Sequence, residues 1–557
     1  MKKTTRRSTT KSAAEKPATA SAPARKSTAA APQEIGGKGE TKEVPSAKSG
    51  GSTTARKNGD RAMSSDERRR ASMRSGEAIS PSLQHTKILC TLGPATATEE
   101  RIRHLILAGA DAIRLNFSHS NYDTHQELFA MTRKVSAELG RHITIIQDLQ
   151  GPKIRIGALP DGPVLLRPAE QVTLTTDVTV SGDPRIPVGY KKFANDVEPG
   201  NTVLIDDGLL ALRVEKVEGN NVLCTILNGG LLKEKKGINL PGAKISEPSL
   251  TEKDLRDLEF GLKLGVDYVA LSFVRSETDI EELKGIIRRK RKTTPVIAKI
   301  EKVEAVRHLD AIIEAADAIM VARGDLGVEM PGHIVPLLQK RIIERCKRRG
   351  KPVITATQML ESMVSNPRPT RAEASDVANA VFDGTDVVML SAETSVGAYP
   401  VEAVMIMDDI IHATESAIGA ETHEKGSYDT LPEEMRRFTE TAVAAKAADV
   451  AAQIRATAIL CLTYTGMTAR VMSRRRSGVP IIAMTQDLEL CRRLGLFSGI
   501  YAVDIETAPS TTEEAVKVME EAALAVKVIK KGDLIVMTTG YPLDAKAGTN
   551  MMVVQRV

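Results

Sequence analysis

Eight short apolar stretches recur between Thr86 and Thr394, and most are followed by an amphipathic segment such as residues 98–108 or 280–289. Near-continuous runs of Val, Ile, Leu and Ala are typical of strands buried on both faces of a parallel sheet. Eight repeats of strand and helix predict an α/β fold built on a (β/α)8 barrel. The predicted strands are 87–92, 112–117, 143–149, 268–273, 296–301, 318–325, 353–358 and 387–394.

One insertion interrupts the repeats after the third strand. Residues 156–236 carry short β runs at 172–175, 202–205, 211–217 and 222–226, separated by Gly, Pro and Asn turns. This pattern predicts a small β-rich lid domain between two barrel segments, 81–155 and 237–422. A polar linker is expected near 423–432, within a C-terminal α/β domain assigned to 423–557. Its predicted strands are 458–462, 480–484, 500–503, 534–537 and 551–554.

The N-terminal segment, residues 1–80, is basic and contains no aromatic residue. It holds 18 Lys and Arg against 8 Asp and Glu, whereas the remaining chain has a net charge of −4. A segment this poor in apolar residues is predicted to be disordered. Three functions stay open for it: a solvated extension, an organelle transit peptide, or a tail that binds nucleic acid or another polyanion.

The five cysteines lie far apart in the sequence, and none belongs to a Cys-x-x-Cys pair. Isolated thiols fit a reducing cytoplasm and argue against a disulfide framework or structural zinc. No apolar run reaches the roughly 18–20 residues that cross a bilayer, so no membrane partner is expected.

Charged side chains gather at the predicted C-terminal strand ends, where the cleft of such a barrel forms. Lys299 and Glu301 are two residues apart on one strand, so they face the same side. Glu301 and Asp325 together make a two-carboxylate site suited to Mg²⁺ or Mn²⁺ that also binds phosphate. Lys299 and Arg114 beside that metal suit phosphoryl transfer. The alternative is an ion-pair network that only stabilises the barrel mouth.

Several of these stretches resemble the pyruvate kinase family. The resemblance rests on residues 91–95, 114–119, 148–155, 236–242, 297–301, 320–329 and 354–363. Residues 298–302, Ala-Lys-Ile-Glu-Lys, resemble the family's active-site signature, and only the N-terminal segment is left uncovered. The resemblance implies a barrel, a lid and a regulatory domain in a cytoplasmic homotetramer. It also implies that phosphoenolpyruvate and ADP are converted to pyruvate and ATP, the last step of glycolysis.

The resemblance further implies a role for individual residues. Glu301 and Asp325 would bind the divalent metal, while Lys299, assisted by Arg114, would stabilise the phosphoryl group in flight. Gly324, Asp325 and Thr357 would hold the substrate's carboxylate end. Thr357 would also join a water in protonating the enolpyruvate carbon. The residues expected to meet the nucleotide are Asn116, Phe117, Ser118, His119, Arg155 and Lys236.

One stretch departs from the potassium-dependent members of the family. The family's potassium site matches Asn116, Ser118, Asp148 and Leu149 here. Potassium-dependent members resemble Asp-Thr-Lys-Gly-Pro-Glu, whereas residues 148–153 read Asp-Leu-Gln-Gly-Pro-Lys. The Lys153 ammonium can stand in for the ion, so we expect an enzyme that does not require potassium. The alternative is a Lys153 that only points to solvent.

The C-terminal domain carries a candidate effector loop between a predicted strand and helix. Hydroxyls and amides at a helix N-terminus suit a phosphate, and the position is similar to the family's effector phosphate loop. A sugar phosphate or AMP is therefore expected as an activator, although an ordinary helix cap uses the same residue types. The loop residues in question are Thr463, Thr465, Gly466 and Thr468.

Two other functions stay open at this point. A different metal-dependent barrel of phosphoenolpyruvate or pyruvate chemistry, such as an aldolase, would need neither the lid nor Lys236 and Arg155. A nucleic-acid-binding role would depend on residues 1–80, because the rest of the chain shows no basic stripe interleaved with aromatic residues.

Overall fold

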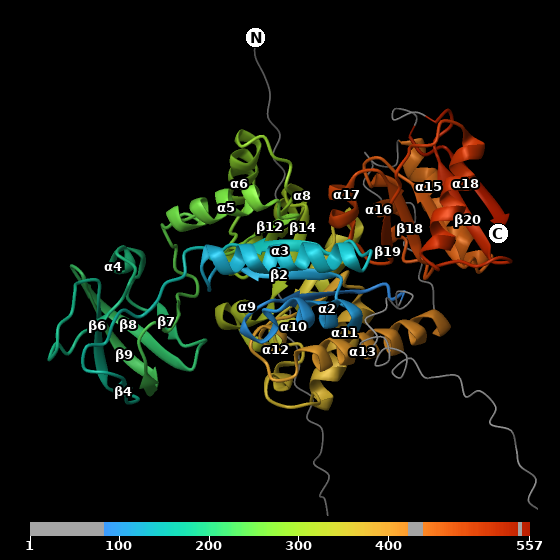
Figure 1. Ribbon diagram of the computed structural model, residues 1–557. Coiled ribbons are helices and arrows are strands. Elements are labelled where there is room, and N and C mark those ends of the chain that lie inside the picture. The colour runs from blue at the N-terminus through green and yellow to red at the C-terminus, as the bar shows by residue number, and fades with distance from the viewer. Residues whose placement is uncertain (1–82, 422–437, 544–547) are drawn as a thin grey trace, which may run out of the picture. The chain divides into compact units, whose positions relative to one another are not determined.

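The computed structural model describes residues 83–421, 438–543 and 548–557 (Figure 1). The predicted disordered segment 1–80 and the predicted linker near 423–432 lie outside these residues. All five cysteines fall within them and are buried and free, which agrees with the absence of a disulfide framework. No helix in the described ranges is long and apolar enough to cross a membrane.

A closed barrel of eight parallel strands confirms the predicted fold class (Figure 1). Around the barrel the strands follow the order β1, β16, β15, β14, β13, β12, β3, β2. Their bounds are β1 Lys87–Thr91, β2 Ala112–Asn116, β3 Thr144–Asp148, β12 Tyr268–Leu271, β13 Val296–Ile300, β14 Ala318–Ala322, β15 Val353–Ala356 and β16 Val387–Leu390.

The sixth and eighth predicted strands were too long. β16 ends at Leu390, and helix α12 (Ala392–Ser395) begins two residues later. β14 ends at Ala322, and Arg323 starts helix α9 (Arg323–Glu329), so residues 323–325 form a helical turn rather than a strand end. The other helices that surround the barrel are α2 Glu99–Ala108, α3 Tyr122–Glu138, α5 Glu252–Leu264, α6 Glu277–Arg289, α7 Val303–Arg307, α8 Leu309–Ala315, α10 Val335–Arg349, α11 Arg371–Asp383, α12 Ala392–Ser395 and α13 Pro400–Glu421.

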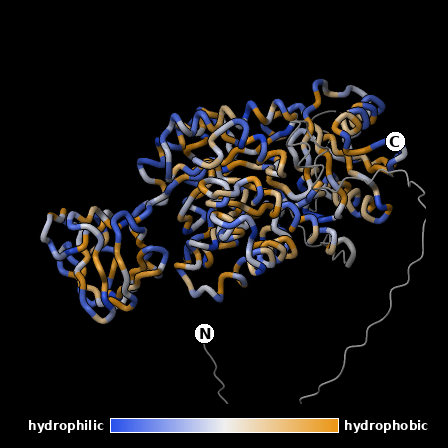
Figure 2. Tube along the Cα trace, turned by 60° about the horizontal axis from the view of Figure 1, so that its bottom comes forward, coloured by the Kyte–Doolittle hydropathy of each residue, from blue (hydrophilic) through white to orange (hydrophobic). Residues whose placement is uncertain are grey.

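The barrel strands are buried on both faces, which explains their continuous apolar sequence. Inward-facing residues such as Leu89, Ile297 and Met320 fill the barrel interior, and Leu496 of the C-terminal domain joins this inner cluster. The alternate residues pack against the surrounding helices. Figure 2 shows the result as hydrophobic strands inside and hydrophilic loops outside.

The insertion after β3 folds as the predicted β lid. A six-stranded sheet has the order β11, β7, β8, β9, β5, β6, and a second pair joins β10 to β4. β11 places Ile238 in this sheet, two residues beyond the expected boundary at 236. The bounds are β4 Val164–Leu166, β5 Gln171–Thr175, β6 Ile186–Pro187, α4 Phe193–Asp196, β7 Thr202–Ile205, β8 Leu210–Glu218, β9 Asn221–Asn228, β10 Gly230–Leu232 and β11 Ile238–Asn239.

The C-terminal domain is a five-stranded sheet of order β19, β18, β17, β20, β21, in which only the last pair is antiparallel. Its five strands overlap the predicted ones. The bounds are α15 Thr439–Gln453, β17 Ala458–Leu462, α16 Met467–Arg474, β18 Ile481–Thr485, α17 Leu488–Leu494, β19 Ile500–Asp504, α18 Thr512–Ala525, β20 Leu534–Thr539 and β21 Met551–Arg556.

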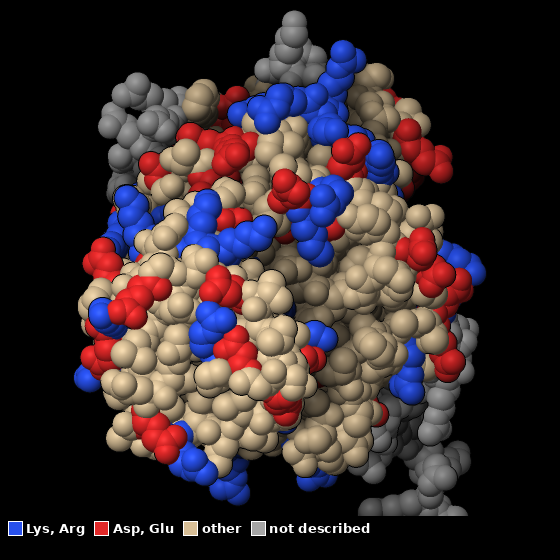
Figure 3. Space-filling view, turned by 90° about the vertical axis from the view of Figure 1, so that its left-hand side faces the viewer, with Lys and Arg blue, Asp and Glu red and all other residues tan. Residues whose placement is uncertain are grey.

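Surface charge is largely mixed on the face of the molecule that Figure 3 shows. Figure 3 shows one face on which Lys and Arg side chains are mostly interspersed with Asp and Glu, apart from one basic group near its upper edge. Such mixing gives no extended basic stripe on this face for a nucleic-acid backbone to follow.

Candidate active site

Lys299 is the centre of a buried polar cluster at the mouth of the barrel. It is the fourth residue of β13, and its side chain is buried because the strand points it inward. Its Nζ lies 2.8 Å from Glu301 Oε1 and 3.3 Å from Asp148 Oδ1. Nζ also donates a 2.6 Å hydrogen bond to Ser272 Oγ. The ammonium is therefore held in one place by three neighbours on three strands or strand ends.

Arg114 adds a second fixed cation to this cluster. From β2, its Nε donates to Asp148 Oδ2 at 2.7 Å and its Nη1 donates to Thr91 Oγ1 at 3.2 Å. Asp148 is only 1% exposed. Its Oδ2 contacts Arg114 and its Oδ1 contacts Lys299, so one carboxylate orients both cations. The cluster thus holds a lysine and an arginine beside one another, both oriented by Asp148.

The charges of this cluster are set by burial and by pairing. Burial opposes the ammonium, but the facing carboxylates of Asp148 and Glu301 raise the pKa of Lys299 above its ordinary value. Burial also opposes the Asp148 carboxylate, yet Lys299 and Arg114 lower its pKa below the usual range. Both groups are consequently charged at neutral pH, as electrostatic stabilisation of a phosphoryl group requires.

Glu301 and Asp325 fit a divalent cation that is shared with substrate. Glu301 Oε2 accepts the Phe273 amide at 2.8 Å, which fixes the carboxylate. Burial and then the nearby charge of Asp325 raise the pKa of Glu301, although Lys299 opposes this, so the two acids lie close enough to repel. No group of three or more His, Cys, Asp or Glu able to hold a metal occurs among the described residues. Two carboxylates with open positions suit Mg²⁺, which keeps water and substrate ligands.

Thr357 lies next to the first turn of α9. It follows β15 in a left-handed conformation, φ 67°, and Gln358 repeats this with φ 54°. Thr357 Oγ1 accepts the Gly324 amide at 2.8 Å and donates to the Ala356 carbonyl at 2.6 Å. Because first-turn amides have no helical partners, the amide of Asp325 stays available beside this hydroxyl. Gly324, Asp325 and Thr357, which we expected to act together, are therefore adjacent.

Arg323 holds this turn from behind and was missed by sequence reasoning. Its Nη2 donates to the carbonyls of Thr357 at 2.7 Å and Gln358 at 3.1 Å, and its Nη1 pairs with Asp376 at 2.6 Å. Ser272, which bridges Lys299 and the Leu149 carbonyl, was also missed. Ser272 lies at the end of a predicted strand, and this position could have marked it as a candidate site residue. No local sequence feature predicted the contacts of Arg323.

The residues expected to meet the nucleotide surround the ends of β2 and β3 and the root of the lid. His119 lies largely at the surface. Its partial burial, and then the charges of Arg155, Lys153 and Arg114, lower its pKa, which indicates that these cations lie near its ring. Arg155 Nη1 donates to the Lys235 carbonyl at 3.1 Å. This arrangement provides a positively charged wall on one side of the cleft.

The remaining nucleotide candidates differ in what they offer. Lys236 Nζ pairs with Asp206 in the lid at 2.8 Å. Asn116 Oδ1 accepts the Ser118 amide at 3.1 Å. Phe117 is 2% exposed and stacks on His125 with ring centroids 4.1 Å apart, so its side chain belongs to the core.

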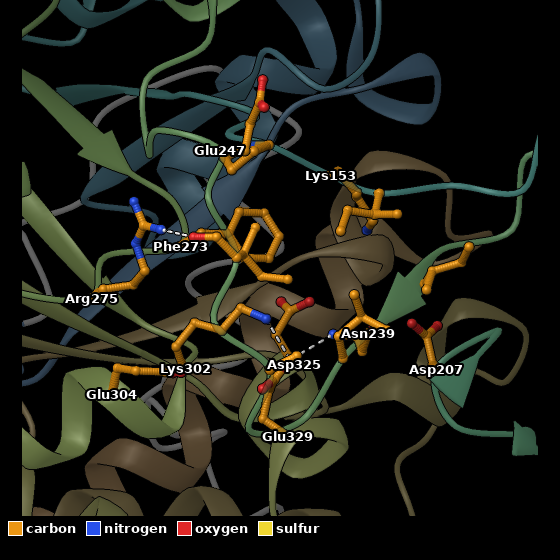
Figure 4. Close-up of a pocket in the computed structure, with 16 residues that line it drawn as sticks. Lys153, Asp207, Asn239, Glu247, Phe273, Arg275, Lys302, Glu304, Asp325 and Glu329 are labelled. Atoms are coloured by element: carbon orange, nitrogen blue, oxygen red, sulfur yellow. Dashed lines mark hydrogen bonds and ion pairs between the residues drawn. The ribbon is translucent and has the colours of Figure 1, made fainter. Parts of the chain in front are cut away.

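Three residues of the expected potassium pocket, Asn116, Asp148 and Leu149, have oxygens that already contact partners within the chain. The Leu149 carbonyl accepts the Ser272 hydroxyl at 2.8 Å, and Asp148 holds Arg114 and Lys299 as described. Lys153 is exposed and lines a pocket together with Phe273, Lys302 and Asp325 (Figure 4). In the same view Glu329 receives hydrogen bonds from Lys302 at 2.5 Å and Asn239 at 3.3 Å.

The candidate effector loop joins β17 to α16. The Gly466 amide donates to Thr463 Oγ1 at 3.0 Å, and Thr468 Oγ1 hydrogen bonds Thr549 Oγ1 at 2.5 Å. Thr463 and Thr468 are buried, whereas Thr465 is exposed at the tip. Gly466 has φ 77°, which a side chain would strain, so the loop turns sharply into the helix.

Two family models match the chain: "Pyruvate kinase, barrel domain" over residues 83–404 and "Pyruvate kinase, alpha/beta domain" over residues 441–555. The pyruvate kinase of Clostridium acetobutylicum is 42% identical over 85% of this chain and 100% of its own length. The pyruvate kinase of Mycobacterium tuberculosis H37Rv is 43% identical over 85% of this chain and 98% of its own.

A solved structure is similar as well. The crystal structure of a pyruvate kinase from Cryptosporidium parvum aligns with a TM-score of 0.80 and 34% identity, over 87% of this chain and 99% of that one. Both the barrel with its inserted lid and the C-terminal domain are thus shared with one family. The alternative of an aldolase-like barrel is set aside by these matches.

Proposed function

The chain belongs to the pyruvate kinase family, Mg²⁺-dependent glycolytic phosphotransferases, and we propose how its own residues perform the reaction. Phosphoenolpyruvate and ADP are the substrates, and pyruvate and ATP are the products. The observation that carries the proposal is the Lys299 ammonium, fixed 2.8 Å from Glu301 and 3.3 Å from Asp148 at the barrel mouth.

The phosphoryl group leaves the enol oxygen of phosphoenolpyruvate and bonds to the terminal phosphate oxygen of ADP. Lys299 and Arg114 neutralise the charge on its oxygens during transfer. Glu301 and Asp325 would hold Mg²⁺, which when bound would neutralise phosphate charge. Because the two cations are already oriented by Asp148, little reorganisation is needed as the charge develops.

The enolpyruvate left behind must gain a proton at its methylene carbon to become pyruvate. We assign this end of the substrate to Gly324, Asp325 and Thr357, whose amides and hydroxyl are adjacent. Thr357 Oγ1 orders the water that delivers the proton. The nucleotide lies along Asn116, Ser118, His119, Arg155 and Lys236, where Lys236 exchanges its Asp206 partner for a phosphate.

Potassium independence is the finer part of the proposal. Lys153 brings a positive charge to the side of the cleft that holds His119, whose pKa is lowered by burial and then by the charges of Arg155 and Lys153. The Lys153 ammonium supplies the positive charge that a bound potassium ion would otherwise provide, so no monovalent cation is required. Activity is measured with phosphoenolpyruvate and ADP in a lactate-dehydrogenase-coupled assay, in buffer free of sodium and potassium. Full activity there supports the proposal, and a large stimulation by added potassium contradicts it.

We further propose that Thr463, Thr465, Gly466 and Thr468 bind the phosphate of a sugar phosphate or AMP activator, and that the enzyme is a cytoplasmic homotetramer. The exposed Thr465 hydroxyl supports the loop assignment. Thr465→Val should weaken activation without changing the unactivated rate. Equal activation of the variant and the parent would contradict the assignment of this loop as the effector site.

A further inference from the structure

A nearly buried carboxylate, Glu329, ends helix α9, and none of the roles assigned so far falls to it. Its side chain is 2% exposed. Lys302 Nζ donates to Glu329 Oε1 at 2.5 Å, and Asn239 Nδ2 donates to the same oxygen at 3.3 Å. Figure 4 shows the two donors reaching Glu329 from different sides of the pocket. Glu329 therefore joins three separate segments of the chain.

Two of these segments carry the proposed metal ligands. Lys302 directly follows Glu301 after β13, and Glu329 lies four residues after Asp325 on α9. Residues four apart on a helix lie on the same face, one turn from each other. Lys302, Asp325 and Glu329 accordingly line one pocket. The Lys302–Glu329 ion pair thus holds the two metal-binding segments at a set separation.

The third segment belongs to the lid. Asn239 is in β11, and its main chain pairs with Leu204 of β7 in the lid sheet. The turn after β7 approaches the same end of α9, since a Cβ placed on Gly208 would lie 3.9 Å from Val328 Cγ1. The lid thus meets the last two residues of α9. Movement of the lid sheet away from the barrel would separate Asn239 from Glu329.

The two contacts of Glu329 differ in how readily they break. Lys302 is 14% exposed and Glu329 2%, so loss of either partner would leave the other charge poorly hydrated. The Asn239 amide is uncharged, and its 3.3 Å hydrogen bond is slightly longer than the usual range. The ion pair is therefore the fixed part of this arrangement, and the amide contact is the part that can form and break with the lid.

We propose that Glu329 couples the position of the lid to the divalent-cation site. Contact between Asn239 and Glu329 holds α9, and with it Asp325, in place beside Glu301. By thermodynamic reciprocity, the lid contact and the affinity for the cation raise one another by the same factor. Glu329 is a positioning residue, because it acts through Asp325 rather than on the cation. This inference rests on the proposed metal ligands, Glu301 and Asp325.

Binding of Mn²⁺ to the full-length protein without substrates, followed by the electron paramagnetic resonance of the free ion, tests the coupling. Asn239→Ala should weaken Mn²⁺ binding roughly fivefold or more, although it removes neither a charge nor a metal ligand. Asn220→Ala is the matched control. It removes another amide-to-carboxylate hydrogen bond of the lid, to Asp177 at 2.8 Å, and should bind Mn²⁺ as the parent does. Melting temperatures check that both variants are folded.

A double-mutant cycle separates the coupling from simple electrostatics. Lys302→Met combined with Glu329→Leu removes the ion pair without changing the net charge, and it should also weaken Mn²⁺ binding. In that background Asn239→Ala should have almost no further effect, because two changes that act through one contact are not additive. Fully additive effects would show that Asn239 does not act through Glu329 and would overturn the proposal.

The reciprocal effect is measured on the lid. Mn²⁺ should slow hydrogen–deuterium exchange of residues 202–205 and 238–239 in the parent, and should not do so in Asn239→Ala. Glu301→Gln tests the metal site itself and should weaken Mn²⁺ binding directly. Parental binding in Glu301→Gln would remove the proposed metal site and this inference together. Weakened binding in Glu301→Gln, with parental binding in Asn239→Ala, would leave the metal site standing and overturn the coupling alone.

Discussion

Arg323 Nη2 donates a 2.7 Å hydrogen bond to the carbonyl of Thr357, the residue whose hydroxyl receives the Gly324 amide. Thr357 and Gln358 both have positive φ, 67° and 54°, which costs conformational energy that the guanidinium contacts offset. Arg323 is thus a positioning residue for the end of β15, connecting a barrel-wall ion pair with Asp376 to the active-site mouth.

Arg323→Lys should lower kcat roughly tenfold to a hundredfold, because lost charge-assisted hydrogen bonds of about 1.5–3 kcal/mol let the Thr357 turn relax. Incorporation of solvent deuterium into pyruvate should fall in parallel, since we propose that Thr357 orders the water that protonates the enolpyruvate carbon. Arg341→Lys, on the exposed surface of α10, serves as the control. A variant that melts lower but exchanges deuterium at the parental rate would show that Arg323 is only structural.

Glu301→Gln should raise the Mg²⁺ concentration for half-maximal activity by at least about tenfold, because a neutral amide is a weaker ligand for a hard cation. Removing Mg²⁺ with EDTA should abolish activity in the parent protein, and added Mg²⁺ should restore it. The measurement is a Mg²⁺ titration of the coupled assay. Glu281→Gln, an exposed position on α6, is the control, and an unchanged Mg²⁺ requirement in Glu301→Gln would reassign the metal ligand.

Lys153→Glu should make activity depend on potassium. The substitution replaces a fixed positive charge with a negative one beside the pocket of Asn116, Ser118, Asp148 and Leu149, so a monovalent cation gains a place. Added potassium should then stimulate the variant several-fold. Lys153→Gln removes the positive charge without reversing it, so this variant should be slower than the parent and should respond less to potassium than Lys153→Glu. Equal responses to potassium in all three proteins would contradict a role for Lys153.

The barrel was predictable because its strands are buried on both faces, so each reads as one apolar run, and all eight were identified. The end of β14 was misplaced because Arg323-Gly324-Asp325 starts a helix for tertiary reasons: Arg323 contacts Thr357 and Asp376, which are 34 and 53 positions away. Short lid strands such as β6 and β10 also escaped prediction, since two or three residues carry little periodicity and depend on distant partners.

The sequence predicted those parts of the candidate site that depend on the order of residues within one strand. Lys299 and Glu301 share a face because side chains on a strand alternate. The partners that fix them could not be read this way: Ser272 reaches Lys299 across 27 residues, and Asp148 holds Arg114 and Lys299 from a third strand. Phe117 shows a limit of motif reasoning, since a position within a motif does not reveal that its side chain is buried and stacks on His125.

We expect His85 to make stability fall in mild acid, because its pKa is lowered in the folded protein. Its amide donates to Glu415 at 2.9 Å and its carbonyl accepts the Gly499 amide at 2.8 Å, so it joins the barrel to the C-terminal domain. Burial lowers its pKa, Glu415 opposes this, and Lys87 and Arg476 add to it. The unfolded chain therefore binds the His85 proton more tightly than the folded chain does. The stability that depends on neutral His85 is fully present above about pH 6.5, the pKa in the unfolded chain, and is lost as the pH falls toward the lower folded pKa. The loss is at most about 1.4 kcal/mol per pH unit. Urea unfolding at pH 7.5, 6.5 and 5.5 should show a shallower decline in His85→Gln than in the parent or His333→Gln, and identical slopes would exclude His85 as the titrating group.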